Sequence, residues 1–484
     1  MKITTVAAGL TMAVALTMTT ALPGGAREAS TTQRIAWQPC AQPELAGLDC
    51  GTLRVPVDWT RPRSGDTELS LVRRTATDQA HRIGSLLLND GAGGSSIQQL
   101  RYALSFGLAD STMAQRFDVV AVDPRGIGNS DPTTCADRPQ RAPGVTYFPR
   151  DAAQFQALVA NNRALAASCG QSTLLAHLDL VSAARDMEAV RIGLGEDQLN
   201  WYGIGYSTLL GKTYAQLYPG RLRTMIADSA LDDSLSPVAR LTTEIRTAEE
   251  SFDRFADWCR AQTSTATCAL AGQDVAGRFD QLVASADRRP IPTSDPRRAL
   301  SGEDIRAAVQ DYLNIQFPQW PRLATAIQAA RDGDATDFTV VQDKTLNRVE
   351  AQTHACLDTP PAATNYRQLA QLERVAAQLS PHLGGAVQGW STMAGCLGWP
   401  APAERPNTTP ARNTPPALII QSTHQSSTAY SWAFGLSRQL PGSVVLTRDG
   451  DDYSMFLFSP CVQAAMDSYL LDRDLPALGT TCTN

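Results

Sequence analysis

The chain has 484 residues, of which 43% are hydrophobic and 19% are charged, and its formal net charge is −6. A chain of this length and composition is typical of a globular protein with one large domain or two smaller ones. The acidic balance and the absence of a basic cluster argue against a surface that binds nucleic acid.

The amino-terminal segment has the pattern of an export signal. Lys2 supplies a positive start, residues 6–16 are mostly apolar, and Gly24 and Ala26 fit a small-residue cleavage site. The apolar run is too short to predict a transmembrane helix. We therefore expect residues 1–26 to be a signal peptide, the mature protein to be secreted, and no stable insertion in a membrane; a membrane or lipid anchor is the alternative.

Ten cysteines agree with export, because an even number in an exported chain favours disulfides. The simplest connectivity joins sequence neighbours: Cys40 to Cys50, Cys135 to Cys169, Cys259 to Cys268, Cys356 to Cys396 and Cys461 to Cys482. The chain has no C-x-x-C motif and its histidines show no metal-ligand spacing. We expect no metal and no cofactor, and we assign no role to His81, His177, His354 and His382.

The first half of the chain alternates strand-like and helical patterns. Short apolar or alternating runs predict strands within residues 51–57, 67–73, 84–89, 117–131, 199–202 and 224–232, and a helical period covers residues 183–195. Strands that alternate with helices in this way indicate an α/β protein with a mostly parallel sheet. We place this first part of the core at residues 35–233.

The character changes over residues 234–405. Helical patterns such as SFDRFADWCRAQ, SGEDIRAAVQDYLNIQF and NYRQLAQLERVAAQL dominate there, and strand signals nearly vanish. Strand patterns return at residues 415–427 and 442–454, after the proline-rich stretch 400–416. This order predicts a helical cap at residues 234–405, inserted before a second part of the core at residues 406–484.

The stretch LNWYGIGYSTLLGKTY, residues 199–214, has the pattern of a nucleophile elbow, in which G-x-S-x-G places a serine on a sharp strand-to-helix turn. Gly205 stands where the serine is expected, and Ser207 follows two residues later. Ser207 is expected in the first turn of the helix. In the alternative, a slipped site with Ser207 as nucleophile, the bulky Leu209 would take the place of the second glycine.

Several motifs then carry a resemblance to a known family. They are WQPC, LDCGTLRVPVDW, LLLNDGAGGSS, FDVVAVDPRGIGNSDPTTC, ARDMEAVRIGLGEDQLNWYG, TYAQLYPGRLRTMIADSALD and SPCVQAAMDSYLLD, in this order. The chain resembles the secreted bacterial tripeptidyl-aminopeptidase-like proteins, which are α/β-hydrolases with a TAP-like carboxy-terminal region. The resemblance implies an α/β-hydrolase fold, a doubly wound, mostly parallel sheet with an inserted helical cap. It also implies cleavage near a free amino terminus by a Ser-Asp-His triad.

The three triad positions of the family all differ in this chain. The serine falls on Gly205, the aspartate on Gln425 and the histidine on Tyr453. Glycine has no nucleophile, glutamine has no negative charge, and a phenol with a pKa near 10 is a poor base. Losing a whole triad costs on the order of 10⁶ in rate. We therefore expect no hydrolysis through an acyl-enzyme.

Other polar groups of the site are retained or replaced. Backbone N–H groups at Gly91, Gly93, Gly94 and Tyr206 can still stabilise a developing negative charge, with Ser207 beside them, although the glycines can equally serve close packing. Tyr453 is expected to face the pocket and to donate to a carbonyl or enolate oxygen, with His424 or Asp452 as the base. In the alternative reading, His424 points away, and Asp451 and Asp452 are solvated turn residues.

Three functions follow from these observations. The first is an exported α/β-hydrolase-fold protein that performs non-hydrolytic acid/base chemistry, of the cyclase, isomerase or lyase type, on a small organic metabolite, as in secondary-metabolite biosynthesis. The second is a non-catalytic pseudoenzyme that binds peptides or a metabolite. The third is a residual peptidase or esterase that uses Ser207. In each case the expected partner is a small molecule or short peptide, and the protein is expected to be a monomer.

Overall fold

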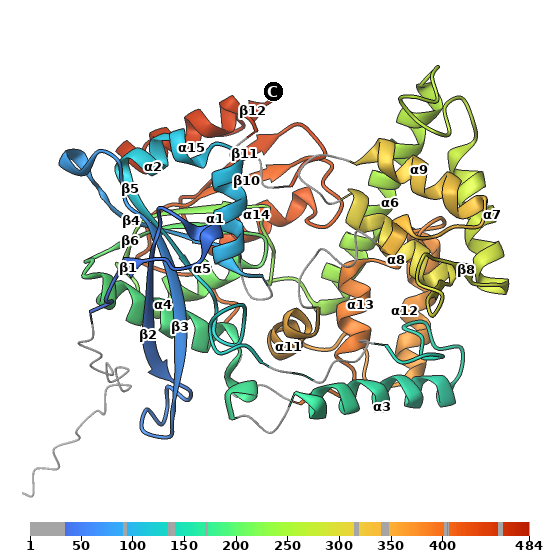
Figure 1. Cartoon of the computed structure of the whole chain (residues 1–484), viewed down its shortest axis with the longest axis horizontal. Helices are drawn as coiled ribbons and strands as arrows, with labels where there is room; N and C mark the ends of the chain where they lie inside the picture. Colours follow the sequence, from blue (N-terminus) through green and yellow to red (C-terminus); the bar gives the residue numbers. More distant parts are fainter. Residues whose placement is uncertain are drawn as a thin grey trace, which may run out of the picture. The chain divides into compact units, whose positions relative to one another are not determined.

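A ten-stranded sheet is the centre of the structure (Figure 1). The computed structural model describes residues 34–90, 94–133, 135, 141–169, 173–313, 319–339, 348–400, 404, 406–453 and 458–483. The expected signal peptide, residues 1–26, lies outside the described residues.

The strands of the sheet are β1 (Gln38–Pro39), β2 (Asp49–Pro56), β3 (Asp66–Arg74), β4 (Gly84–Asn89), β5 (Phe117–Val122), β6 (Leu199–Ile204), β7 (Leu222–Asp228), β10 (Leu418–Ser422), β11 (Val444–Arg448) and β12 (Thr481–Cys482). Their order across the sheet is β1-β2-β3-β5-β4-β6-β7-β10-β11-β12. The pairs β1–β2, β2–β3 and β3–β5 are antiparallel, and the remaining neighbours are parallel. The prediction of a mostly parallel sheet is confirmed.

The helices lie between and beside these strands. They are α1 (Ser96–Ser105), α2 (Thr112–Arg116), α3 (Ala152–Ser168), α4 (Leu180–Leu194), α5 (Ser207–Leu217), α6 (Pro237–Ala261), α7 (Val275–Arg288), α8 (Gly302–Leu313), α9 (Trp320–Arg331), α11 (Arg348–Asp358), α12 (Tyr366–Leu379), α13 (Gln388–Gly395), α14 (Tyr430–Gln439) and α15 (Pro460–Asp472). Short 3-10 turns lie at Pro43–Leu45, Gln79–His81, Leu108–Asp110 and Thr173–His177, and a small hairpin joins β8 (Ile291–Pro292) to β9 (Ala299–Leu300).

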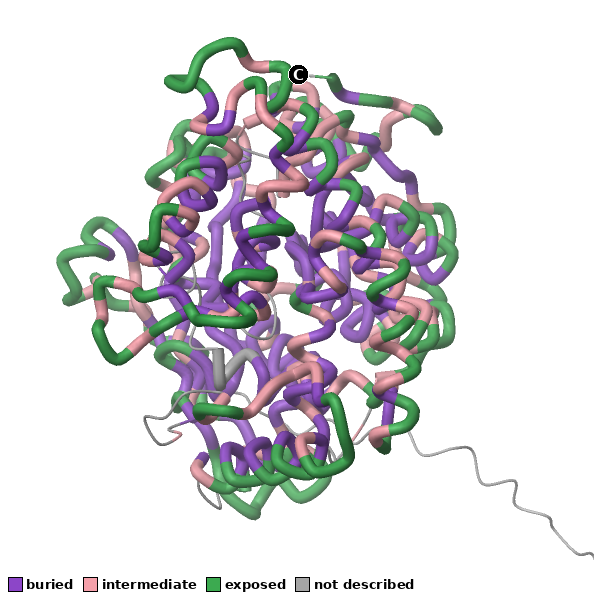
Figure 2. The backbone as a smooth tube through the Cα atoms, turned by 90° about the vertical axis from the view of Figure 1, so that its right-hand side faces the viewer, coloured by how far each residue is buried: buried purple, intermediate pink, exposed green. Residues whose placement is uncertain are grey.

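Helices cover both faces of the sheet. Apolar side chains of α4, α5 and α14 share one hydrophobic cluster with the strands, and those of α1, α2 and α15 share another. Strands β5 and β6 are buried at every position, as expected for a parallel sheet that is covered on both sides. In Figure 2 the buried segments gather in the interior and the exposed segments follow the outer turns.

The helices between β7 and β10 form a hydrophobic core of their own. It contains apolar residues of α6, α7, α8, α9, α12 and α13. Helix α3 also contributes, through Phe155, Leu158 and Val159, although it precedes β6 in the chain. The boundaries of the cap at residues 234 and 405 stay a prediction, and α3 packs with the helices that lie between them.

Five disulfides join the ten cysteines as sequence neighbours, which confirms the predicted connectivity. The pairs are Cys40–Cys50, Cys135–Cys169, Cys259–Cys268, Cys356–Cys396 and Cys461–Cys482. Such bonds persist in an oxidising compartment. Across the described ranges, no helix combines the length and the apolar character needed to cross a membrane.

Candidate active site

The turn between β6 and α5 has the geometry of a nucleophile elbow. Strand β6 ends at Ile204 and α5 begins at Ser207. Gly205, between them, has a φ of +56°, a left-handed conformation that is costly for residues with a side chain. Its N–H donates to the carbonyl oxygen of Asp228 at the end of β7, 2.9 Å away. This hydrogen bond attaches the turn to β7, so that residue 205 lies directly after the carboxyl end of β6.

Tyr206, the next residue, connects this turn to α11. Its hydroxyl donates to a carboxylate oxygen of Asp358, 2.6 Å away, and burial, followed by the charge of Asp358, raises the pKa of Tyr206 well above its usual value. Its backbone N–H has no hydrogen-bond partner among the described residues. This N–H is therefore free to bind a negatively charged oxygen, as the sequence analysis expected of an elbow donor.

Ser207 lies in the first turn of α5, where the sequence placed it. Its side chain is fully buried. Its hydroxyl has no hydrogen-bond partner within the described part of the chain, so no described side chain acts on it as a base. A nucleophilic serine needs a base within hydrogen-bond reach.

Tyr453 lies in the loop that follows β11, and its hydroxyl reaches the elbow. A Cβ atom built on Gly205 would overlap this hydroxyl, so the phenol occupies the space of a residue-205 side chain. The ring packs against the hydrophobic cluster on the α1 side of the sheet. Burial, followed by the charges of Asp90 and Asp228, raises the pKa of Tyr453 well above its usual value. The hydroxyl therefore stays protonated at neutral pH and is available as a donor.

Asp90 is a residue of this region that the sequence analysis did not select. It directly follows β4, the strand beside β6. Burial raises the pKa of its carboxyl group to about 7. The sequence contained a signal for Asp90, which is its position directly after a predicted strand. The carboxyl ends of neighbouring parallel strands meet at one edge of a sheet, and the sites of this fold class form at that edge.

Asp228, the last residue of β7, was also not selected. One carboxylate oxygen accepts from the Tyr202 hydroxyl at 2.9 Å and the other from the Ser229 hydroxyl at 3.1 Å. Because both oxygens are engaged, Asp228 holds its neighbours in place and contributes a fixed negative charge close to Tyr453.

The glycines expected to donate to a negatively charged oxygen are only partly described. Gly91 and Gly93 lie outside the described residues. Gly94 is buried, and a Cβ atom at its position would lie 2.5 Å from a carboxylate oxygen of Asp90. Residue 94 must therefore remain small for the Asp90 carboxylate to keep its place.

Gln425, expected at the triad's acid position, is buried and bonded within its own loop. Its amide oxygen accepts from the N–H and the hydroxyl of Thr428, and its amide nitrogen donates to the Ser427 hydroxyl at 2.8 Å. The side chain stabilises the turn after β10.

His424, which precedes Gln425, is held through its backbone. Its N–H donates to the carbonyl oxygen of Gly450 at 3.0 Å, and its own carbonyl oxygen accepts from the Ser251 hydroxyl of α6 at 2.9 Å. The imidazole ring is partly buried and forms no hydrogen bond to a described residue. The backbone bond between His424 and Gly450 shows that the loops after β10 and β11 are adjacent.

The two aspartates before Tyr453 are ion-paired, so the expectation that they are solvated turn residues is wrong. Asp451 accepts two hydrogen bonds from Arg254 of α6, at 2.7 and 2.8 Å. Asp452 lies 3.4 Å from Arg448 at the end of β11, and burial, which outweighs the effect of Arg448, raises its pKa. Both carboxylates hold the loop that carries Tyr453.

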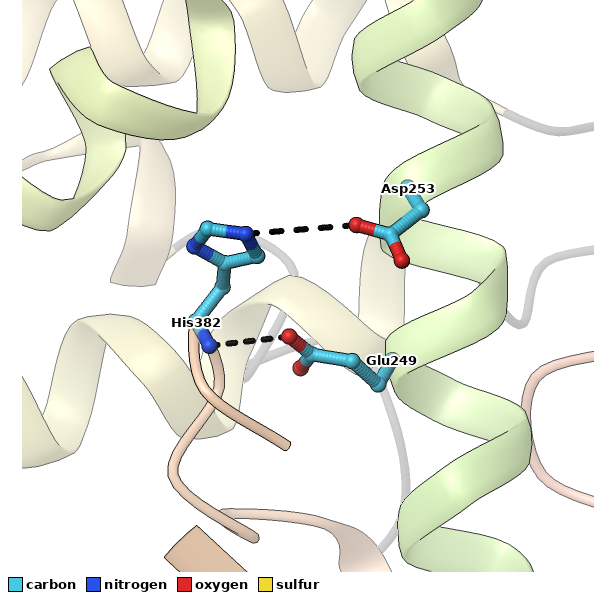
Figure 3. A group of neighbouring side chains, drawn as sticks. All are labelled: Glu249, Asp253 and His382. Atoms are coloured by element: carbon cyan, nitrogen blue, oxygen red, sulfur yellow. Dashed lines mark hydrogen bonds and ion pairs between the residues drawn. The ribbon is translucent and has the colours of Figure 1, made fainter. Parts of the chain in front are cut away.

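One group of described side chains has ligand atoms close enough for a metal ion: Glu249, Asp253 and His382, shown in Figure 3. Glu249 accepts hydrogen bonds from the Ser380 hydroxyl and from the N–H groups of His382 and Leu383, at 2.6 to 3.1 Å. Its carboxylate therefore fixes the start of the turn after α12. The partly buried His382 ring is paired with two exposed carboxylates, those of Asp280 at 2.9 Å and Asp253 at 4.0 Å.

Two surface cavities lie away from Tyr453. One, of about 490 Å³, is lined by Gln198, Leu222, Arg223, Tyr469 and Arg473 among others, at the amino ends of β6 and β7. The other, of about 330 Å³, lies around Asp58, His177 and Arg185. Asp90, Tyr206 and Tyr453, whose pKa values are raised, lie instead at the opposite, carboxyl ends of the strands, which is the usual place for a site in an open α/β sheet.

Two family models match the chain. The α/β-hydrolase fold matches residues 84–307, and the TAP-like protein model matches residues 380–482. The chain is 28% identical to the serine protease Hip1 of Mycobacterium tuberculosis, with 93% of this chain and 91% of the relative covered. It is 29% identical to carboxylesterase B of the same organism, with 92% and 89% covered. It is 26% identical to the tripeptidyl aminopeptidase of Streptomyces coelicolor, with 93% and 86% covered.

Solved structures are similar only at a coarse level. The acetyl esterase MekB aligns with a TM-score of 0.40 and 11% identity, over 87% of this chain and 94% of that one. The fold assignment therefore depends on the family models and on the strand order described above. The chain contains an α/β-hydrolase-fold region and a TAP-like carboxy-terminal region, and it is homologous to tripeptidyl aminopeptidases.

Proposed function

We propose that this protein performs non-hydrolytic acid/base chemistry, of the isomerase, cyclase or lyase type, on a small organic metabolite, as in secondary-metabolite biosynthesis. The observation that carries the proposal is the position of the Tyr453 hydroxyl, which takes the space of a side chain on Gly205. A proton donor thus replaces a nucleophile at the elbow. The three family triad positions, on this proposal, are Gly205, Gln425 and Tyr453.

The chemistry available to Tyr453 is donation. With its pKa raised, the phenol is a weak base but keeps its proton for a substrate oxygen. The free N–H of Tyr206 lies on the same turn and can share that oxygen. Two donors aimed at one oxygen stabilise an enolate or a developing alkoxide.

The hydrolytic alternative through Ser207 is less well supported. The Ser207 hydroxyl is buried and meets no described base, and Leu209 follows where the elbow needs a small residue. The other alternative, a pseudoenzyme that only binds a ligand, is separated from the proposed function by the experiment below.

The proposal includes export. Five disulfides are the supporting observation, because reducing compartments do not preserve them. A signal peptide at residues 1–26, a small-molecule or short-peptide ligand, action without a metal or cofactor, and a monomeric state are parts of the same proposal.

The test is metabolite profiling of a strain that lacks the gene. The deletion is complemented with the wild-type gene, with Tyr453→Phe, or with Tyr430→Phe as a matched control. Tyr430 also loses a hydroxyl, which contacts the Thr447 hydroxyl of β11 at 2.7 Å. We expect one compound to accumulate in the deletion strain and with Tyr453→Phe, and to disappear with the wild type and the control.

The purified protein is then given the accumulated compound. Conversion to an isomer, or loss of the elements of water, supports the proposal. Addition of the elements of water, or full complementation by Tyr453→Phe, contradicts it. If no compound accumulates and the purified protein retains a small molecule in native mass spectrometry, the protein is a binder.

A further inference from the structure

We propose that Asp90 is a catalytic residue of this site, the base that removes a proton from the substrate and returns it as an acid. This inference rests on the proposed function and gives the reaction its base, a role for which the sequence suggested His424 or Asp452. The geometry of three neighbouring strands carries it.

Strands β4, β6 and β7 are adjacent and parallel, so their carboxyl ends lie side by side (Figure 1). Asn89 is paired with Gly203, and Ile204 with Asp228. Asp90 is therefore one step beyond the strand pairing, level with the start of the elbow. The hydroxyl of Tyr453 enters the same region from the loop after β11.

The carboxylate of Asp90 lacks the partners that comparable residues have. Asp123 follows the neighbouring strand β5, and Asp228 ends β7. The donors to Asp123 are the Ser95 hydroxyl and the N–H groups of Ile97 and Asn129, and the donors to Asp228 are the hydroxyls of Tyr202 and Ser229. The Asp90 carboxylate accepts no hydrogen bond from any residue in the described ranges. Asp90 is partly buried and yet has no described partner, and one explanation for such missing hydrogen bonds is a catalytic role.

The charge environment of Asp90 suits a proton carrier. Burial raises its pKa to about 7, and no cation is close enough to oppose that effect. A group with a pKa near the working pH can both take up and release a proton. Asp452, in contrast, is paired with Arg448. Asp90 is only partly buried, so its carboxylate remains accessible to a ligand.

The reaction balances without a co-reactant. The Asp90 carboxylate takes the proton from a substrate carbon that lies between a carbonyl group and a C–C double bond, so that the anion formed is a conjugated dienolate. The electron pair of that C–H bond forms a C–C double bond, and the carbonyl π pair moves to oxygen, where the Tyr453 hydroxyl donates a hydrogen bond. The protonated Asp90 then delivers its proton to a different carbon of the conjugated system, and the carbonyl group re-forms. The product is an isomer of the substrate.

The test compares Asp90→Asn, Tyr453→Phe and His424→Gln on the compound that accumulates in the deletion strain. We expect the first two variants to lose turnover by a factor on the order of 10² to 10⁴ and the third to stay close to the wild type. Asp90→Asn loses no described hydrogen bond, so it should fold; Asp90→Glu, which keeps the carboxyl group, should recover part of the activity.

A measurement without substrate gives an independent check. In the Glu373→Gln background, infrared spectra from about pH 5 to about pH 9 should show a protonated carboxyl band that disappears with a midpoint near 7, and Asp90→Asn should remove it. Glu373 is replaced because burial raises its pKa to about 7 as well. Absence of the band, or full turnover by Asp90→Asn while Tyr453→Phe is inactive, overturns the role of Asp90 alone. Full turnover by Tyr453→Phe overturns the proposed function, and the role of Asp90 with it.

Discussion

The Tyr206 hydroxyl donates a hydrogen bond to Asp358, 2.6 Å away, and so joins the elbow of the sheet to the end of α11. The other oxygen of the same carboxylate accepts from the N–H of Leu180 at the start of α4, at 3.0 Å. The Asp358 carboxylate thus connects three elements: the elbow, helix α4 and helix α11. The backbone N–H of Tyr206 is held at the site by this side-chain contact.

Tyr206→Phe should destabilise the protein. The substitution removes the hydrogen bond to the Asp358 carboxylate, and a hydrogen bond to a charged group contributes about 1.5–3 kcal/mol. Chemical denaturation measures the free energy of unfolding. Tyr430→Phe is the control, because it removes a hydroxyl that contacts the neutral Thr447 hydroxyl and not a carboxylate. An equal loss in the two variants would contradict the structural role of Tyr206.

Removing single disulfides should destabilise the protein in order of loop length. Cys356 and Cys396 are 40 residues apart, whereas Cys259 and Cys268 are 9 apart. The loop-entropy model gives about 4 kcal/mol for the longer loop and roughly 2.6 kcal/mol for the shorter one. Double alanine variants of each pair, compared by denaturant unfolding, test this order. A larger loss for the shorter loop would show that native contacts, not loop closure, dominate.

Local sequence signals predicted the framework of the site well. The alternation of strands and helices led to the parallel sheet, and the stretch around Gly205 led to a strand, a turn and a helix that begins at Ser207. The sheet and the turn depend on short segments whose geometry the local sequence determines. The expectation that Tyr453 reaches the elbow came from the family resemblance, and it agrees with the structure, in which the hydroxyl takes the space of a residue-205 side chain.

Features that depend on distant partners were not predictable. Asp451 forms an ion pair with Arg254, 197 residues earlier in the chain, and no local sequence pattern predicts such a contact. Gln425 looked like a substituted catalytic acid, yet its side chain stabilises its own turn through Thr428. Asp90 differs from Asp123 and Asp228 by the hydrogen bonds that its carboxylate lacks among the described residues, which a sequence does not record.

Asp90→Asn should raise stability above neutral pH and leave it unchanged in acid. The folded pKa is about 7 and the unfolded value is 3.8, so the unfolded chain releases its proton first as the pH rises. Wild-type stability should therefore fall between about pH 4 and 7, by at most about 4 kcal/mol. Thermal melts at about pH 3.5 and pH 8 measure the effect. A variant that is less stable than the wild type at the higher pH would mean that the carboxylate has a stabilising partner.

A serine-directed fluorophosphonate probe should not label the purified protein. Gly205 offers no oxygen, and the Ser207 hydroxyl is buried without a described base. Gly205→Ser should remain unlabelled too, because the new side chain meets the Tyr453 hydroxyl, and a phenol is a poor base for a serine. Gly205→Ser combined with Tyr453→Phe removes that hydroxyl without adding a base, and it should also stay unlabelled.

Adding Gln425→Asp and Tyr453→His to Gly205→Ser provides the positive arm of the same experiment. This triple variant supplies nucleophile, base and acid at the three positions to which the proposed function assigns the triad, so labelling at residue 205 should appear. Its rate should be limited by how well the turn after β10 tolerates loss of the Gln425 amide. Mass mapping of the labelled peptide locates the probe. A reactive serine at residue 207 would require a base, and no described side chain acts as one there. Labelling of the wild type at Ser207 would therefore contradict this description of the elbow and support hydrolysis through Ser207.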